Sequence, residues 1–277
     1  MAKKVLYLGN SKWCWTENCS QHAKVIADKA AYVQAKETGD EGQILKASSR
    51  LISTPEGLHT YRYLKTQELR NELGRQPVLG LDLDNTTGDF TVGLREYEAT
   101  KLKLPKDEWL SHFPDPDEYS MWMGENAWYP SQENFLERLR TAENEGIYLR
   151  LPVYPEASNT LHDLKAYGFR LKAITARSEI FNVDTRAWIT EGKIPTKTIL
   201  NPGNDKHKIK NVDVYMDDSP HVINTLLEND KNVIAMKQSY NGSNIPEHDN
   251  VRHVDQWGDG VVEAVFDLVD KNRKNNK

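Results

Sequence analysis

From residue 77 onward, short apolar segments alternate with longer segments that have a helical pattern. Short apolar segments without a polar face are typical of strands buried on both sides, and helices between them connect parallel strands. We therefore predict an α/β fold, a Rossmann-like parallel sheet with helices on both faces. The predicted strands are 78–83, 170–174, 198–200, 214–216 and 233–236, and the predicted helices are 132–145, 156–167, 181–191, 220–228 and 260–269.

Two regions depart from this alternation. Residues 1–76 are predicted to form a mostly helical N-terminal extension, with one helix over 20–37 and another that begins after Thr54 and ends at Gly74. The second domain then covers 77–277. Within it, residues 88–150 are helical in pattern and rich in aromatic residues. We predict that this segment is a helical cap inserted over a site.

Acidic and hydroxyl side chains stand where three of the predicted strands end. These residues are Asp82, Thr175 and Asp217, and parallel sheets bind ligands at the carboxyl ends of their strands. Asp82 is followed two positions later by Asp84. One such carboxylate can attack phosphorus, and the other can exchange protons with the leaving group and water. The alternative is a solvated strand end with turn-forming residues.

The other strand ends offer groups that suit a phosphate and a metal ion. The segment KAITARS (172–178) brings a threonine hydroxyl and backbone N–H groups to a strand–helix junction, although an ordinary cap has the same pattern. Asp217 and Asp218 form an acidic pair of the kind that Mg²⁺ prefers, and an N-cap would explain only one of them. Lys206 or Lys208 can neutralise phosphate charge, or either can be an ordinary surface lysine.

Taken in order, these segments resemble the four motifs of the haloacid dehalogenase (HAD) superfamily of phosphatases. The motifs are DLDNT (82–86), ITAR (174–177), Lys206 and YMDDSP (215–220), and the resemblance covers about residues 77–257. Within the superfamily, the chain looks most like the 5′(3′)-deoxyribonucleotidases. The segment TGDF (87–90) after the first motif and Trp257 before the last helix carry this closer likeness.

The resemblance implies a role for each motif residue. Asp82 would be the nucleophile and Asp84 the acid/base. Mg²⁺ would be held by Asp82, the main-chain oxygen of Asp84 and either Asp217 or Asp218. The implied phosphate ligands are Thr175, Ala176, Arg177 and Lys206.

Two features depart from the family pattern. Asn85 stands where many members have glycine. The spacing from Lys206 to Asp217 is also about one residue long, so Lys208 stays an alternative to Lys206.

The predicted cap contains the segment YSMWMGENAWYP (119–130). Its aromatic side chains can form an apolar slot on which a nucleobase stacks, and the alternative is ordinary packing of the cap. In the deoxyribonucleotidases the corresponding region contacts base and sugar. The predicted substrate-pocket residues are Phe90, Trp122, Trp128 and Tyr129.

Composition limits the partners and the cellular location. A net charge of −5 over 277 residues gives no basic field for duplex nucleic acid, and no apolar run is long enough for a membrane helix or a secretory signal. Two closely spaced cysteines favour a reducing, cytoplasmic setting.

Cys14, Cys19 and His22 form a partial zinc motif that His59 would complete, but two reduced cysteines are the favoured interpretation. Residues 1–76 are a candidate surface for self-association or for another partner.

The predicted function is a Mg²⁺-dependent phosphomonoesterase that hydrolyses (deoxy)nucleoside monophosphates through an aspartyl-phosphate. The predicted partner is therefore a small phosphate ester. Two alternatives stay open at this point, a phosphatase for polynucleotide ends and a non-catalytic binding protein with the same fold.

Overall fold

The computed structural model describes residues 20–275. Its contacts divide the chain into two compact units. The first holds the described residues up to Pro77 together with Ala166–Phe169, and the second holds Val78–Lys165 and the residues from Arg170 onward. Each unit is described by itself.

The first unit is helical, as predicted. It contains α1 (Ser20–Thr38), α2 (Glu41–Leu51) and α3 (Pro55–Leu73). The hydroxyl of Thr54 accepts the backbone N–H of Gly57 at 3.1 Å, which caps α3, and Gly74 ends this helix at a φ of 65°. The helices enclose a small core of Val25, Tyr32, Ala35, Ala47 and Leu51.

The predicted zinc motif falls largely outside the described part of the chain. Cys14 and Cys19 precede residue 20, and the side chain of His22 is not described. Nδ1 of His59 is in hydrogen-bond contact with the hydroxyl of Tyr167 within the first unit. The interpretation of Cys14 and Cys19 as reduced cysteines stays a prediction.

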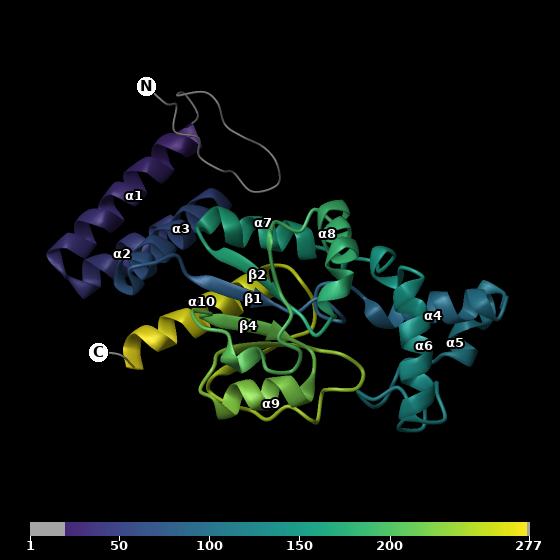
Figure 1. Ribbon diagram of the computed structural model, residues 1–277. Coiled ribbons are helices and arrows are strands. Elements are labelled where there is room, and N and C mark those ends of the chain that lie inside the picture. Colours follow the sequence, from purple (N-terminus) through teal and green to yellow (C-terminus); the bar gives the residue numbers. More distant parts are fainter. Residues whose placement is uncertain (1–19, 276–277) are drawn as a thin grey trace. The chain divides into compact units, whose positions relative to one another are not determined.

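The second unit is built on a parallel sheet, which confirms the predicted fold class (Figure 1). The strand order is β3-β2-β1-β4-β5-β6, and every neighbouring pair is parallel. The strands are β1 (Val78–Leu81), β2 (Arg170–Ile174), β3 (Thr198–Leu200), β4 (Val214–Asp217), β5 (Val233–Met236) and β6 (Val251–Val254). All residues of β1, β4 and β5 are buried, as a sheet covered on both faces requires.

Helices cover both faces of this sheet. Figure 1 shows α7 (Ala157–Tyr167) and α8 (Asn182–Glu191) on one side of the sheet and α9 (Pro220–Glu228) on the other. The last helix, α10 (Asp259–Asn275), contacts β4, β5 and β6. The core beneath α9 joins its buried residues Val222, Ile223 and Leu226 to the strands. Strand β6 was not predicted from the sequence.

The segment between β1 and α7 is helical and lies apart from the helices that cover the sheet (Figure 1). It contains α4 (Phe90–Lys101), α5 (Trp109–His112) and α6 (Gln132–Asn144), with short 3-10 helices at Lys106–Glu108 and Ile147–Leu149. Glu98 of α4 connects α4 to α6. It accepts a hydrogen bond from Nε of Arg138 on α6 at 3.1 Å and one from the hydroxyl of Tyr129 at 3.0 Å. We call residues 88–150 the cap.

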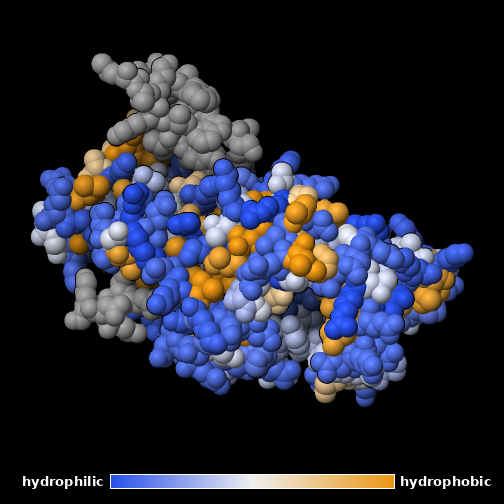
Figure 2. Space-filling model, in the orientation of Figure 1, coloured by the Kyte–Doolittle hydropathy of each residue, from blue (hydrophilic) through white to orange (hydrophobic). Residues whose placement is uncertain are grey.

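The surface is mostly hydrophilic on the face drawn in Figure 2, with separate apolar patches. Among the described helices, none combines the length and the apolar character needed to cross a bilayer.

Candidate active site

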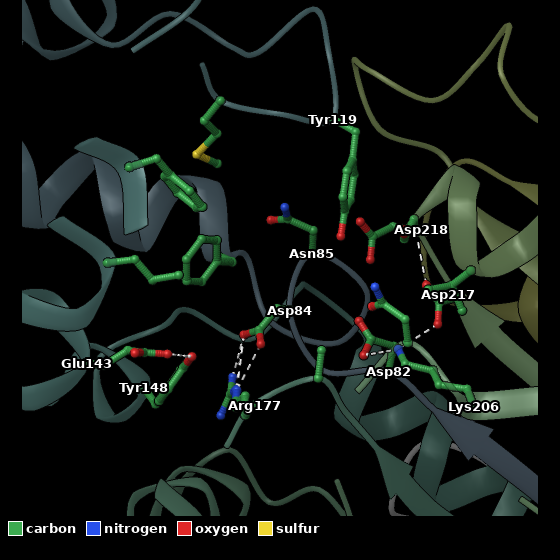
Figure 3. Close-up of a pocket in the computed structure, with 18 of the residues that line it drawn as sticks. Asp82, Asp84, Asn85, Tyr119, Glu143, Tyr148, Arg177, Lys206, Asp217 and Asp218 are labelled. Carbon is green, nitrogen blue, oxygen red and sulfur yellow. Dashed lines mark hydrogen bonds and ion pairs between the residues drawn. The ribbon is translucent and has the colours of Figure 1, made fainter. Parts of the chain in front are cut away.

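The carboxyl ends of β1 and β4 bring three aspartates together. β1 pairs with β4 up to Leu81 and Met216, and the N–H of Asp82 continues the pairing by donating to the carbonyl of Met216 at 2.9 Å. Asp82 and Asp217 therefore leave adjacent strands at the same level, with Asp218 beside them (Figure 3). Carboxylate oxygens of Asp82, Asp217 and Asp218 lie within 4.8 Å of one another, and all three residues are buried.

Lys206 joins two of these carboxylates. Its Nζ lies 2.5 Å from Oδ1 of Asp82 and 2.7 Å from Oδ2 of Asp217. The hydroxyl of Tyr215 fixes the turn that carries the lysine, because it donates to the carbonyls of Lys206 and Ile209. Lys208 is exposed and pairs instead with Asp205 at 2.7 Å. The structure thus brings Lys206, and not Lys208, to the three aspartates.

The surroundings of Asp218 and Asp82 affect how readily their carboxyl groups ionise. Oδ1 of Asp218 accepts the hydroxyl of Thr86 at 2.8 Å, and Oδ2 accepts the hydroxyl of Tyr240 at 2.6 Å. Burial and the neighbouring Asp217 raise the pKa of Asp218 to about 7. Burial also raises the pKa of Asp82 well above its usual range, although Lys206 opposes the rise. The carboxyl groups are therefore costly to ionise together without further positive charge.

This donor set fits a divalent cation. Three carboxylates and one ammonium leave an excess of two negative charges in a buried space. The available donors are all oxygen atoms, which hard cations such as Mg²⁺ and Ca²⁺ prefer. The three aspartates can therefore hold a metal ion, and its charge would balance theirs.

The loop after β1 is shaped by Asn85. This residue has a φ of 57°, a left-handed conformation that glycine adopts freely and that asparagine tolerates better than most other residues. Its Oδ1 accepts the backbone N–H of Thr91 at 2.9 Å, which ties the loop to the start of α4. Asparagine thus satisfies a backbone requirement at the position where many family members have glycine. Trp257 supports the same loop by donating to the carbonyl of Thr86 at 2.9 Å.

Asp84 points away from the other three aspartates and toward Arg177 (Figure 3). Nη2 of Arg177 lies 2.6 Å from Oδ1 of Asp84, and Nε lies 3.0 Å from Oδ2. The guanidinium of Arg177 is therefore engaged by a carboxylate. The sequence did not reveal this ion pair, and the role of Arg177 as a phosphate ligand stays a prediction.

The two other predicted phosphate ligands of the second motif, Thr175 and Ala176, differ in their position relative to the cavity. Thr175 is fully buried, and its hydroxyl accepts the backbone N–H of Arg177 at 3.2 Å. It does not line the cavity described below, whereas Ala176 does.

A cavity of about 260 Å³ lies between the strand ends and the cap. Its floor includes Asp82, Asp84, Ala176, Lys206, Asp217 and Asp218. Its cap wall includes Phe90, Tyr119, Met121, Trp122, Phe135, Leu139, Glu143 and Tyr148. Catalytic candidates and a mainly apolar wall thus face the same cavity.

Two of the four predicted pocket residues line this cavity and two do not. Phe90 and Trp122 are in its wall. Trp128 donates from Nε1 to the carbonyl of Pro114 at 2.7 Å, and the hydroxyl of buried Tyr129 donates to Glu98. The polar atoms of Trp128 and Tyr129 are thus bonded within the cap, and a role of these two residues in binding substrate stays a prediction.

The sequence analysis missed Tyr119, Glu143 and Tyr148. Tyr119 lies in the same segment as the predicted pocket residues Trp122, Trp128 and Tyr129, and its ring packs on that of Tyr240 at 5.6 Å between centroids. Glu143 accepts the hydroxyl of Tyr148 at 2.6 Å. None of these three residues belongs to a motif, so their place in the cavity wall becomes visible only in the folded cap.

A second missed feature is the segment 238–241, which follows β5. Three consecutive residues each contact a different part of the site. Gln238 donates to the carbonyl of Asn85 at 2.6 Å, Ser239 donates to the carbonyl of Pro116 in the cap at 2.5 Å, and Tyr240 donates to Asp218. This segment therefore connects the first-motif loop, the cap and the acidic group.

Comparison with known proteins identifies the family. The family model described as 5′ nucleotidase, deoxy (pyrimidine), cytosolic type C protein (NT5C) matches residues 76–271. The chain belongs to the NT5C family. The predicted resemblance to HAD phosphatases close to the deoxyribonucleotidases is thereby confirmed.

Two bacterial relatives of this NT5C-family chain carry the name "Putative nucleotidase". The protein of Oceanobacillus iheyensis is 30% identical over 97 residues, which are 32% of this chain and 52% of that protein. The protein of Bacillus cereus is 28% identical over 121 residues, which are 41% of this chain and 61% of that protein. The chain thus spans between half and two thirds of the length of these relatives.

Solved structures with a similar chain path have low sequence identity. One, titled as a "Putative Phosphatase" from Clostridium difficile, is 15% identical, covers 68% of this chain and 97% of its own, and has a TM-score of 0.46. An L-2-haloacid dehalogenase is 14% identical, covers 71% and 99%, and has a TM-score of 0.42.

Proposed function

We propose that this protein is a Mg²⁺-dependent phosphomonoesterase that hydrolyses (deoxy)nucleoside monophosphates. The observation that carries this proposal is the group of Asp82, Lys206, Asp217 and Asp218, buried at adjacent strand ends and open to one cavity. Membership of a nucleotidase family supports the same activity.

Asp82 is the proposed nucleophile. Its carboxylate attacks phosphorus, and the bond to the leaving oxygen breaks with its electron pair on that oxygen, which takes a proton from Asp84. Water then attacks the aspartyl-phosphate and gives a proton to Asp84. The bond between phosphorus and Asp82 breaks, and inorganic phosphate leaves.

Lys206 and the second motif are proposed to hold the phosphate. The ammonium of Lys206 already lies against Asp82, where negative charge gathers during transfer. Ala176 lines the cavity and offers its backbone there, and the hydroxyl of Thr175 braces the turn beneath it.

Mg²⁺ is the proposed metal, held by Asp82, the main-chain oxygen of Asp84 and the pair Asp217 and Asp218. It would supply positive charge to the phosphate oxygens. The carboxylates of Asp82, Asp217 and Asp218 fit this role because all three are buried and lie within 4.8 Å.

A nucleoside monophosphate is the proposed substrate class. Phe90, Trp122 and Phe135 give the cavity an aromatic wall opposite the acidic floor, so a base and a phosphate can be accommodated at opposite ends. The family description names a deoxy, pyrimidine and cytosolic nucleotidase, which supports this class and a cytoplasmic location.

The test is phosphate release from a panel of 5′- and 3′-(deoxy)nucleoside monophosphates and phosphorylated oligonucleotides, with and without Mg²⁺. The proposal predicts Mg²⁺-dependent release from mononucleotides at higher kcat/KM than from oligonucleotides. No release from any mononucleotide would contradict it.

A further inference from the structure

The second-motif residue Arg177 holds both carboxylate oxygens of Asp84. Its Nη2 and Nε contact Oδ1 at 2.6 and 3.2 Å, and Nε also contacts Oδ2 at 3.0 Å. The side chain of Asp84 is 26% exposed, whereas that of Arg177 is fully buried. Both residues line the cavity, and Asp84 is the more exposed partner of the pair.

The guanidinium of Arg177 is fixed from several sides. It lies 4.1 Å from the ring centroid of Tyr148 and 5.0 Å from that of Trp188. Its Nη1 donates to the hydroxyl of Thr185 at 3.3 Å, and Trp188 is itself held by a bond to the carbonyl of Leu151. The guanidinium is therefore held in one position, from which it can orient the carboxyl group of Asp84.

Tyr148, near the end of the cap, connects this ion pair to the cap helix α6. Its ring packs on Arg177, while its hydroxyl donates to Glu143 of α6 at 2.6 Å. Glu143, Tyr148, Arg177 and Asp84 all line the same cavity (Figure 3). A continuous line of contacts thus runs from the cap helix α6 to Asp84.

We propose that Arg177 is a positioning residue for proton transfer, which holds Asp84 in place and is itself positioned by the cap through Tyr148 and Glu143. This inference rests on the proposed phosphatase function and adds a role for three residues to it. The proton that Asp84 gives to the leaving oxygen in the first step returns from water in the second. Arg177 takes no part in either bond change.

Leaving groups separate this role from a structural one. A nucleoside alkoxide needs a proton as it departs, whereas para-nitrophenolate is stable without one. The value of kcat/KM reports the first irreversible step, which here is departure of the leaving group. A residue that positions the proton donor therefore affects nucleotides much more than para-nitrophenyl phosphate.

The experiment measures kcat/KM for a deoxynucleoside monophosphate and for para-nitrophenyl phosphate in wild type, Arg177→Lys and Asp84→Asn. For Arg177→Lys we expect a loss of about 10²-fold on the nucleotide and less than about tenfold on the aryl ester, because general acid catalysis contributes about 10²–10⁴-fold. Asp84→Asn should show the same selective loss. Arg186→Lys is the control, since Arg186 is an exposed arginine near Trp188 on α8.

Equal losses on the two substrates, or no loss, in Arg177→Lys would overturn the inference. If Arg177→Lys does not fold, Tyr148→Phe decides, because it keeps the ring over Arg177 and removes only the bond to Glu143. We expect Tyr148→Phe to lose activity on the nucleotide alone, and unchanged kinetics on both substrates would overturn the inference. A wild type that is inactive on both substrates would instead contradict the proposed function.

Discussion

The floor and the cap wall of the cavity are built on different physical principles. At the floor, the buried ammonium of Lys206 contacts the buried carboxyl groups of Asp82 and Asp217, which stand at adjacent strand ends. The cap wall is mainly aromatic and aliphatic, and its Glu143 accepts a hydrogen bond from the hydroxyl of Tyr148. From this contrast we infer that the charged groups of the floor can act on the phosphate of any ester. The wall can distinguish esters by the group attached to that phosphate.

The largest expected effect comes from removing the cation at the floor. Lys206→Met leaves buried carboxylates uncompensated, so we expect kcat to fall by about 10³-fold and the free energy of unfolding to fall by about 3 kcal/mol or more. Added Mg²⁺ should recover part of the stability, because it supplies the missing charge. Phosphate release and chemical denaturation with and without Mg²⁺ measure both effects.

Lys208→Met is the matched control, since Lys208 is an exposed lysine two residues away that pairs with Asp205. It should leave activity unchanged. If both variants lost activity equally, the assignment of Lys206 to the floor would be wrong.

The next effect concerns the hydrogen bond that the hydroxyl of Tyr240 donates to Asp218. Tyr240→Phe should raise the Mg²⁺ concentration needed for half-maximal activity by about tenfold, because partners that orient a metal ligand contribute about 10–100-fold to affinity. Activity and the thermal midpoint, each titrated with Mg²⁺, check this. Tyr97→Phe, which removes a hydroxyl bonded to Glu145 in the cap, should leave both titrations unchanged.

At the cap wall, two tryptophans make a direct comparison. Trp122 lines the cavity, and Trp128 packs within the cap. Trp122→Ala should raise KM for a nucleotide by roughly 5–150-fold, since stacking on a base is worth about 1–3 kcal/mol, and should leave KM for para-nitrophenyl phosphate unchanged. Trp128→Ala should lower the thermal midpoint with little effect on KM. The opposite pattern would mean that the base lies elsewhere.

The smallest effect is expected in the cap loop around Asp117. The backbone N–H groups of Glu125 and Asn126 lower the pKa of Asp117 in the folded protein. A lowered folded pKa stabilises the fold at pH values above the unfolded pKa, and this stabilisation is lost as the pH falls through the folded pKa. Asp117→Asn should therefore lower the thermal midpoint at pH 7, and the difference from wild type should shrink toward pH 3. A difference that stays constant with pH would contradict this account.

The sequence predicted the floor better than the wall, for a physical reason. Strands β1 and β4 are short, mainly apolar runs that lead directly into aspartates, so their ends could be placed by residue type alone. Strand β6 was missed because its central Arg252 and His253 are partly exposed, which interrupts the apolar pattern. Spacing could not separate Lys206 from Lys208, because the choice depends on the turn that Tyr215 fixes.

The wall could not be predicted in the same way. Which aromatic side chains reach the cavity depends on how the cap folds, and Trp122 and Trp128 are indistinguishable by pattern. The pairing of Arg177 with Asp84 joins residues 93 positions apart, and that of Tyr240 with Asp218 joins residues that no motif links. Such contacts come from tertiary packing.

The central claim is that Asp82 carries the phosphoryl group during turnover. The most direct measurement is acid quenching of the Asp84→Asn variant with para-nitrophenyl phosphate and Mg²⁺, followed by mass spectrometry of its peptides, because the leaving group of this ester needs no proton donor. The account predicts a phosphoryl group on the peptide at Asp82, and none in Asp82→Asn. A phosphoryl group on another residue, or turnover that persists in Asp82→Asn, would contradict it.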